Sequence, residues 1–362
     1  MKVVIFCGGY GTRFWPISRK STPKQFVPFL NGKSFFQLTY QRFRKQFAPE
    51  EIFVSTEENY TSFIRKQAPE VPRHNIISEP ERKDLLAACG LATAVVNKYF
   101  PGESVLISWA KHLIARESVF LDAVMAAGDF ADKTGLIVSV DSKPSYPSVH
   151  NGWVRLGKKI GRINEFNILQ IEKHVEKPEK ELAEKLFKEG GWLINTGYRV
   201  WKTDVMLSHY KKFQPKMYDS LMEIVEAWGT KKQDKVLKEI YHTLDKDSVE
   251  YGIFEKLPGD VRATIAADMG WEDVGISWEL FYKSLITPKR KSIIEGGCET
   301  QLIDSENNLI IGSKGKMIAV IGLSDIAVID TADGLLVCKL DQTQKVKDLY
   351  ANLEHYYKEY TK

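Results

Sequence analysis

The sequence has 362 residues, of which 43% are hydrophobic, so it is long enough for two ordinary domains with sizeable cores. An aromatic content of 11% excludes disorder as the dominant state. Lys and Arg number 51 against 47 Asp and Glu, and the resulting net charge of +4 is too even a balance to indicate nucleic-acid binding.

The apolar runs and the cysteines indicate the compartment. Arg13 and several glycines interrupt the apolar N-terminus, which is therefore unlike a signal peptide. The longest uncharged apolar run, 85–96, is too short to cross a bilayer. No CxxC pairing occurs, which favours buried free thiols over a zinc site or disulfides at Cys7, Cys89, Cys298 and Cys338. We therefore expect a cytoplasmic protein without a membrane segment.

The first 140 residues alternate between predicted strands and predicted helices. The apolar run 2–6 predicts a buried strand. One face of a predicted helix carries Phe36, Tyr40, Phe43 and Phe47. Further strands are expected over 51–55, 75–78, 104–108 and 135–140, and further helices over 57–66, 82–99 and 119–130. This alternation predicts βαβ units, and hence an α/β fold with a mostly parallel sheet.

Between residues 143 and 286 the predicted elements are more mixed. Strands are expected over 153–156, 167–175, 192–201 and 261–266, and helices over 179–188, 278–284 and much of 202–256. No change in composition separates this part from the first. We therefore interpret residues 1–286 as one α/β domain with an inserted substrate lobe over about 143–256.

A basic run after Pro288 marks the predicted start of a second, smaller domain. Short β-type runs follow over 309–311, 318–321, 326–329 and 335–337, with turn signals between them. Their short, regular spacing is typical of a stacked β solenoid. Residues after about Gln342 predict a terminal helix, so residues 292–362 are expected to form a β-rich domain that ends in a helix.

A glycine-rich turn, residues 8–13, directly follows the first predicted strand. Gly8, Gly9 and Gly11 would let backbone N–H groups approach a ligand closely. Arg13 adds a planar, permanently charged fork that suits phosphate oxygens. The spacing matches neither GxGxxG nor GxxxxGK[ST]. Taken alone, the turn fits a phosphate-binding loop and a tight strand-to-helix turn about equally well.

The continuation of this turn, GGYGTRFWPISRKSTPKQF over residues 8–26, resembles the signature of the sugar-1-phosphate nucleotidylyltransferase family. Within that family it looks most like the mannose-1-phosphate guanylyltransferases. Further motifs of the family match in the same order down the chain: Glu79-Pro80 with Arg82, Glu176-Lys177-Pro178, Asn195-Thr196-Gly197, 248–256, 270–275 and 328–337. The ordered set covers nearly the whole chain, which makes the resemblance specific.

The resemblance implies a fold and a set of site residues. The expected fold is a Rossmann-like nucleotidyltransferase sheet with a small C-terminal left-handed β-helix-like domain. The resemblance implies that Arg13 and Lys24 are catalytic and that Asp273 holds Mg²⁺. It implies nucleotide binding by Gly8, Gly9, Gly11, Thr12, Arg13, Glu79, Arg82 and Lys111. It implies sugar-phosphate binding by Glu176, Lys177 and Asn195.

The reaction implied by the resemblance is transfer of a guanylyl group from GTP to mannose-1-phosphate, which gives GDP-mannose and pyrophosphate. The nucleophile is already an anion, so such a site needs fixed cations and good positioning rather than a general base. A homodimer is expected. Two alternatives stay open: a nucleotidylyltransferase for another pair of nucleoside triphosphate and sugar phosphate, and a catalytically impaired regulatory paralogue that binds sugar nucleotide.

One position departs from the family pattern in a way that affects the chemistry. Lys111, just before His112, stands where the family has an Asp that is a second metal ligand. An ammonium group repels a cation, so metal affinity should fall. Three interpretations follow: an altered site with reduced activity, a lysine that supplies the charge of the metal, or a regulatory paralogue. Smaller departures are Lys83-Asp84 and the additional Ile276.

Overall fold

The computed structural model describes residues 1–362, which form two compact units. Unit 1 comprises residues 1–8, 42–109 and 114–271, and unit 2 comprises residues 9–41, 110–113 and 272–362. Most of the glycine-rich signature therefore groups with the C-terminal part of the chain. The proposed domain boundary between residues 286 and 292 divides the chain at a different place and stays a prediction.

Unit 1 is built on one ten-stranded sheet. In spatial order its strands are β3 (Ile76–Glu79), β2 (Ile52–Glu57), β1 (Lys2–Phe6), β4 (Ser104–Trp109), β10 (Arg199–Lys202), β6 (Ile137–Asp141), β11 (Arg262–Ala266), β8 (Phe166–Val175), β7 (Trp153–Ile163) and β9 (Trp192–Ile194). Strands β10, β8 and β9 run against the other seven. The predicted mostly parallel sheet is confirmed.

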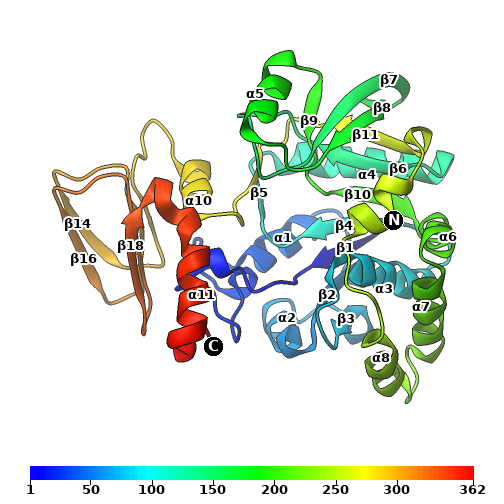
Figure 1. Ribbon diagram of the computed structural model, residues 1–362, viewed down its shortest axis with the longest axis horizontal. Helices are drawn as coiled ribbons and strands as arrows, with labels where there is room; N and C mark the ends of the chain where they lie inside the picture. Colours follow the sequence, from blue (N-terminus) through cyan, green and yellow to red (C-terminus); the bar gives the residue numbers. More distant parts are fainter. The chain divides into compact units, whose positions relative to one another are not determined.

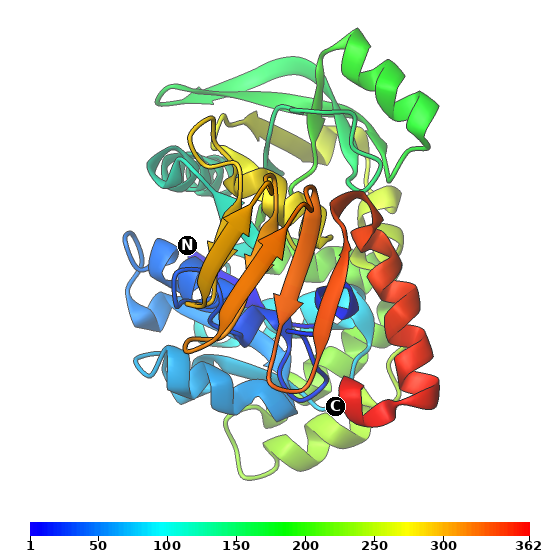
Figure 2. The same cartoon turned by 90° about the vertical axis from the view of Figure 1, so that its left-hand side faces the viewer.

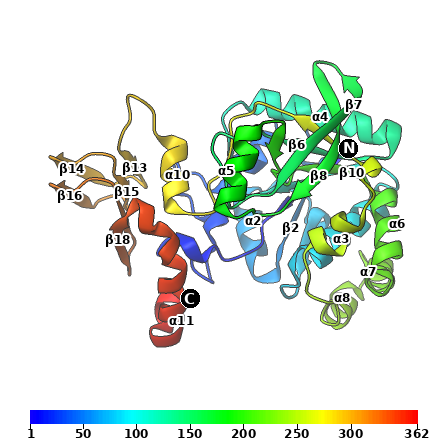
Figure 3. The same ribbon diagram turned by 45° about the horizontal axis from the view of Figure 1, so that its top comes forward.

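Helices cover this sheet on both faces where its inner strand β1 is apolar on both sides. Val3, Val4 and Ile5 of β1 are fully buried, as in strands covered on both sides. The helices are α2 (Thr61–Gln67), α3 (Asp84–Tyr99), α4 (Glu117–Thr134), α5 (Lys180–Glu189), α6 (Thr203–Phe213), α7 (Pro215–Ala227), α8 (Gln233–Tyr241) and α9 (Val249–Gly252). Figures 1 and 3 show α6 and α7 beside α3, with which they share one apolar core.

The strand predicted over 192–201 is wrong in one respect, because it is two strands, β9 and β10. The Asn195 side chain accepts a hydrogen bond from the Gly197 amide at 3.0 Å, which turns the backbone. Gly197 has a φ of 80°, and a Cβ there would lie 2.6 Å from the Trp109 indole nitrogen. Both the conformation and the space therefore require glycine at this turn.

The C-terminal strands of unit 2 coil as a small β-helix-like domain. One sheet holds β13 (Ile293–Glu295), β15 (Leu309–Ile311), β17 (Ile326–Asp330) and β18 (Leu335–Lys339), and the other holds β14 (Glu299–Ile303) and β16 (Met317–Ile321). Ile293 pairs with Leu309, Glu299 with Met317 and Leu309 with Ala327, so the chain returns to the same place after 16 residues in the first coil and after 18 in the next. Only β18 is antiparallel to its neighbour. Figure 2 shows these strands as neighbouring ribbons with the terminal helix at one side.

The remaining elements of unit 2 bind the signature segment to these strands. They are α1 (Phe35–Phe43, its last two residues in unit 1), α10 (Trp278–Leu285) and α11 (Val346–Tyr356), with the short strands β5 (His112–Ile114) and β12 (Trp271–Asp273) at the boundary. The rings of Phe14 and Trp278 lie 4.3 Å apart between centroids. The Trp15 indole donates a hydrogen bond to the Tyr360 carbonyl at 2.9 Å. The terminal helix predicted after Gln342 is confirmed as α11.

Two further expectations concern the whole chain. All four cysteines are free thiols, and Cys7, Cys89 and Cys298 are buried as predicted, whereas Cys338 is only half-buried. None of the helices combines the length and the apolar character that a membrane-spanning segment requires.

Candidate active site

The signature segment in unit 2 holds its own conformation. The Ser18 hydroxyl donates to the Tyr10 carbonyl and accepts from the Lys24 amide, and the Gln25 side chain donates to the Gly9 carbonyl at 3.1 Å. Gly9 and Gly11 have φ values of 86° and 69°, in the left-handed region that favours glycine. The segment is therefore a folded loop with its glycines at the turns, as a phosphate-binding loop requires.

Two lysines and one aspartate lie together beside this loop, and we call Lys24, Lys111 and Asp273 the lysine–aspartate cluster. The Lys111 ammonium lies 2.7 Å from Asp273 Oδ2, and His112 Nε2 lies 3.7 Å from the same oxygen. The other carboxylate oxygen accepts a hydrogen bond from the Gly275 amide at 3.1 Å. The Lys24 ammonium donates to the Gly275 carbonyl at 2.5 Å. All members of the cluster belong to unit 2.

Burial and charge shift the pKa values of the cluster in opposite directions. Burial lowers the pKa of Lys24 to about 7, assisted by the charges of Lys111 and Arg13 and opposed by Asp273. Burial alone would raise the pKa of the Asp273 carboxyl, but Lys111 and His112 hold it well below its usual range. The carboxylate is thus charged at every physiological pH. Additional negative charge close to Lys24 would raise its pKa again.

Glycines at two points leave the room that these lysines occupy. A Cβ at Gly11 would lie 2.6 Å from Lys24 Cδ. A Cβ at Gly275 would lie 2.5 Å from Lys24 Nζ and 3.1 Å from Lys111 Cβ. The Lys24 ammonium also lies 4.8 Å from the centroid of the Phe14 ring, whose electron-rich face stabilises the charge. The lysines are therefore held in place before any ligand arrives.

The Mg²⁺ implied by the family resemblance does not fit the side chains around Asp273. Protein sites for Mg²⁺ use carboxylate oxygens together with water and substrate phosphates. Asp273 is the only carboxylate in the cluster, and an ammonium group already lies 2.7 Å from one of its oxygens. No group of three or more His, Cys, Asp or Glu side chains is arranged to hold a metal ion in residues 1–362. The donor set is that of a cation-rich site for anions.

In unit 1, the predicted sugar-phosphate residues lie at the ends of β8 and β9. Glu176 lies 3.1 Å from the Lys177 ammonium and 3.5 Å from His174 Nε2. A Cβ at Gly152 would lie 2.6 Å from Glu176 Oε2 and 3.5 Å from Asn195 Cβ. The structure therefore brings Glu176 and Asn195 together around Gly152, and Lys177 lies beside Glu176.

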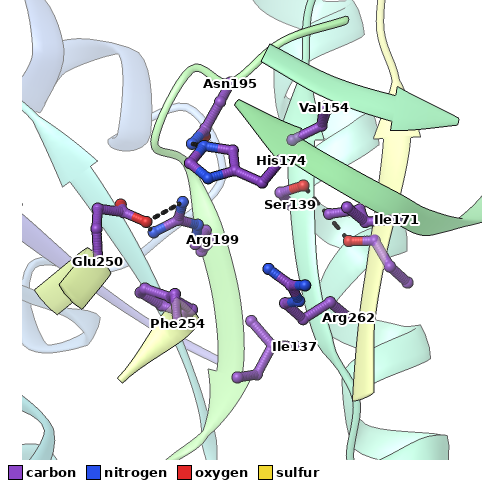
Figure 4. Close-up of a pocket in the computed structure, with 11 residues that line it drawn as sticks. Ile137, Ser139, Val154, Ile171, His174, Asn195, Arg199, Glu250, Phe254 and Arg262 are labelled. Atoms are coloured by element: carbon purple, nitrogen blue, oxygen red, sulfur yellow. Dashed lines mark hydrogen bonds and ion pairs between the residues drawn. The ribbon is translucent and has the colours of Figure 1, made fainter. Parts of the chain in front are cut away.

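The sequence analysis missed three residues of this region. His174 Nε2 lies 3.4 Å from the side-chain nitrogen Nδ2 of Asn195. Burial lowers the pKa of His174, and the charge of Arg199 lowers it further. Arg199 and Glu250 form a two-point ion pair with distances of 2.7 and 3.1 Å. Figure 4 shows Asn195 and His174 side by side near this pair. The signals were present: His174 precedes Glu176 by two residues, the period of a strand face, and Glu250 lies inside a matched motif.

These residues line one pocket of unit 1, into which the Arg262 guanidinium also points (Figure 4). Its wall consists of Ile137, Ser139, Val154, Ile171, His174, Asn195, Arg199, Glu250, Phe254, Arg262 and Ala263. The pocket is mixed in character, because it combines aliphatic side chains with hydrogen-bonding groups. The space inside it is small, with room for about one water molecule, so the pocket as it stands does not hold a whole sugar phosphate.

The two remaining predicted nucleotide residues lie at the end of β3 in unit 1. The Glu79 carboxylate is buried and accepts hydrogen bonds from Tyr241 at 2.7 Å and Ser55 at 3.0 Å. Arg82 pairs with Glu57 at 3.3 Å and is partly exposed. Both oxygens of Glu79 therefore have partners within the protein, whereas Arg82 remains accessible to a ligand.

Glu79 should make stability depend on pH. Burial raises its pKa from 4.5 to about 7. The folded chain then binds the proton more tightly than the unfolded chain, so the free energy of unfolding falls as the pH rises from 4.5 to 7 and levels off above 7. The expected loss is about 3 kcal/mol. In denaturant titrations at several pH values, Glu79→Gln should remove most of this dependence and the exposed control Glu70→Gln should retain it. An unchanged profile in Glu79→Gln would contradict the assignment.

An α/β sheet whose first strand leads into a glycine loop with clustered lysines defines a class of nucleotide-binding transferases. The chain belongs to the nucleotidyl transferase family, whose model matches residues 2–287. A second model, the MannoseP isomerase/GMP-like beta-helix domain, matches residues 299–353. The expected fold, a nucleotidyltransferase domain followed by a β-helix-like domain, is confirmed.

Particular relatives are similar over nearly the full chain. Mannose-1-phosphate guanylyltransferase 2 from Escherichia coli O157:H7 is 29% identical over 97% of this chain and 73% of its own length. Mannose-1-phosphate guanylyltransferase RfbM from Salmonella typhimurium is 28% identical over 96% of this chain and 71% of its own length. A crystal structure described as mannose-1-phosphate geranyltransferase from Thermus thermophilus matches with a TM-score of 0.86 and 24% identity, and covers 98% of this chain and 99% of that one. The last likeness concerns the fold alone.

Proposed function

We propose that this chain transfers a guanylyl group from GTP to mannose-1-phosphate and releases pyrophosphate. The observation that carries the proposal is the similarity to proteins named mannose-1-phosphate guanylyltransferase, which extends over 97% of the chain. Both subsites support it. Unit 2 offers cations beside a glycine loop, and unit 1 places Glu176 beside Lys177 and near Asn195.

The proposed chemistry assigns unit 2 to the triphosphate. Gly8, at the end of unit 1, and Gly9, Gly11 and Thr12 cradle the phosphates with backbone N–H groups. Arg13 and Lys24 bind the phosphate oxygens and stabilise the charge that moves onto the leaving pyrophosphate. Because the sugar phosphate attacks as an anion, no side chain needs to remove a proton. Cations held in advance are therefore the main contribution of the protein.

The proposed roles in unit 1 concern the sugar phosphate and the base. Glu176 and Asn195 bind hydroxyl groups of the sugar, and Lys177 binds its phosphate. Arg82 contacts the nucleotide, and Glu79 supports that region from within. We also propose a cytoplasmic homodimer. We assign no protein site to Mg²⁺, because the groups around Asp273 do not fit it.

A substrate panel tests the proposal most directly. Each of the four common nucleoside triphosphates is mixed with mannose-1-phosphate, glucose-1-phosphate or a heptose-1-phosphate, and pyrophosphate is assayed. The expected result is the fastest release with GTP and mannose-1-phosphate. Faster release with another pair would identify that pair as the substrates in place of GTP and mannose-1-phosphate. Absence of pyrophosphate with every pair would indicate a paralogue that binds sugar nucleotide without turnover.

Loss of the Glu176 carboxylate should affect one substrate only. Glu176→Gln removes a charged acceptor for a sugar hydroxyl, which is worth about 1.5–3 kcal/mol, so KM for mannose-1-phosphate should rise by roughly ten- to hundredfold. KM for GTP should stay within about twofold under this assignment. Glu172→Gln, an exposed carboxylate on the same strand, is the matched control. Equal changes in both KM values would indicate general damage.

A further inference from the structure

The lysine–aspartate cluster occupies the place where the family resemblance implies a protein-bound metal ion. We infer that the Lys111 ammonium, together with Lys24, supplies the positive charge of that ion, so that this chain binds a nucleoside triphosphate without a metal held by the protein. The inference rests on the proposed function for its substrate and deepens it by naming the cation that faces the phosphates.

The first argument is the position of Lys111. Its ammonium lies 2.7 Å from Oδ2 of Asp273, whose side chain is only 7% exposed, whereas the Lys111 side chain is 39% exposed. The lysine thus covers the carboxylate from the open side. A metal ion could reach this oxygen only by displacing the ammonium, but a phosphate oxygen can contact the ammonium directly.

The second argument is charge. Lysine in place of aspartate changes the side chain from one negative to one positive charge, a difference equal to the charge of one Mg²⁺ ion. The Lys111–Asp273 pair is close to neutral as a whole, and Lys24 and Arg13 are two further cationic side chains nearby. A lysine acts on phosphate as a point charge, as a bound cation does.

The third argument is that the cluster is organised in advance. The Gly275 amide donates a hydrogen bond to Asp273 Oδ1 at 3.1 Å, and the Gly275 carbonyl accepts one from the Lys24 ammonium at 2.5 Å. The missing side chain of Gly275 leaves room for both lysines, since a Cβ would lie 3.1 Å from Lys111 Cβ. Charges fixed before binding stabilise a developing anion without reorganisation, which is the usual benefit of a resident metal.

The test measures GTP binding by calorimetry, with no sugar phosphate present, in EDTA and in excess Mg²⁺. We expect the unmodified chain to bind GTP in EDTA at least as tightly as in Mg²⁺. Lys111→Met should weaken binding in EDTA by roughly ten- to hundredfold, the usual effect of one charged hydrogen bond. Lys111→Asp should weaken it further in EDTA, and Mg²⁺ should restore most of the loss in Lys111→Asp but not in Lys111→Met.

Controls separate this result from misfolding and from general charge effects. Lys283→Met removes an exposed lysine of α10 that pairs with Glu279, and it should leave GTP binding unchanged. Circular dichroism checks the fold of each variant. If Lys111→Met leaves an unpaired carboxylate that unfolds the chain, the double variant Lys111→Met with Asp273→Asn removes both charges and takes its place.

The inference is overturned by GTP binding that requires Mg²⁺ in the unmodified chain, or by unchanged binding in EDTA when Lys111 is neutralised. Absence of GTP binding in every condition overturns it as well. The proposed function is tested separately by pyrophosphate release in the substrate panel. If metal-free binding depends on Lys111 but no pyrophosphate appears, the proposed function fails and the inference about the cation stands.

Discussion

Replacing Lys24 with methionine is expected to lower kcat for pyrophosphate release by about 10²–10³-fold, the usual effect of removing one fixed group that stabilises a developing oxyanion. Methionine keeps the length and most of the packing of the lysine but removes its charge. The Lys24 side chain is buried and its ammonium is held by the Gly275 carbonyl, so its charge has a fixed position. Initial rates at saturating GTP and sugar phosphate measure the effect.

Two further variants serve as controls in the same experiment. Lys283→Met, on the exposed face of α10, should retain the rate of the unmodified chain. Lys24→Arg should recover little, because a wider guanidinium group has no space between Gly11 and Gly275. A Lys24→Met variant within threefold of the unmodified rate would remove this lysine from the chemistry.

The second large effect is expected from alanine at Gly11. Gly11 and Gly32 have the same φ of 69°, so alanine should cost each site a similar backbone strain of about 1–2 kcal/mol. They differ in surroundings. A Cβ at Gly11 would lie 2.6 Å from Lys24 Cδ, whereas a Cβ at Gly32 has no atom within 4 Å. Gly11→Ala should therefore displace Lys24 and reduce kcat by at least about 10²-fold.

Gly32→Ala is a matched control for that variant. Gly32→Ala should lower the denaturant concentration at the midpoint of unfolding by about as much as Gly11→Ala does. Unlike Gly11→Ala, it should keep nearly full activity. Denaturant titration and initial rates on both variants measure the two quantities separately. Equal activity in the two variants would mean that Lys24 does not depend on the space at Gly11.

The fold was predictable where one segment determines one element. The run 309–311 is a strand with the predicted bounds, and the helix predicted over 82–99 differs by two residues at its start. Prediction failed where distant segments determine the structure. Strands β5 and β12 have three residues each and pair across about 160 residues of sequence, so no local pattern marks them. The break at Asn195 depends on its side chain, which accepts a hydrogen bond from the backbone amide of Gly197 two residues on.

The candidate site was predictable as a set of residues but not as an arrangement. The matched motifs located Lys24, Lys111 and Asp273, and the sequence raised the question of what an ammonium does beside that carboxylate. Only the structure shows that the two groups pair at 2.7 Å. The burial of Glu79 could not be foreseen, because its partner Tyr241 lies 162 residues away. His174 has the two-residue spacing from Glu176 that places residues on one strand face, but alternate residues of every strand share that spacing, so it did not single out this histidine.

The composition of unit 2 has a consequence for how this chain can be shortened or recombined. A truncation after residue 286 would keep every residue proposed for the chemistry. It would also remove Ile293, Leu309 and Ile329, which share one apolar core with Phe14 of the signature segment and with Phe29 just after it. Exposing such side chains costs roughly 1.5–3 kcal/mol each. The C-terminal coils therefore complete the apolar core that supports the signature segment. A chimera that transfers this segment to another protein needs to include them.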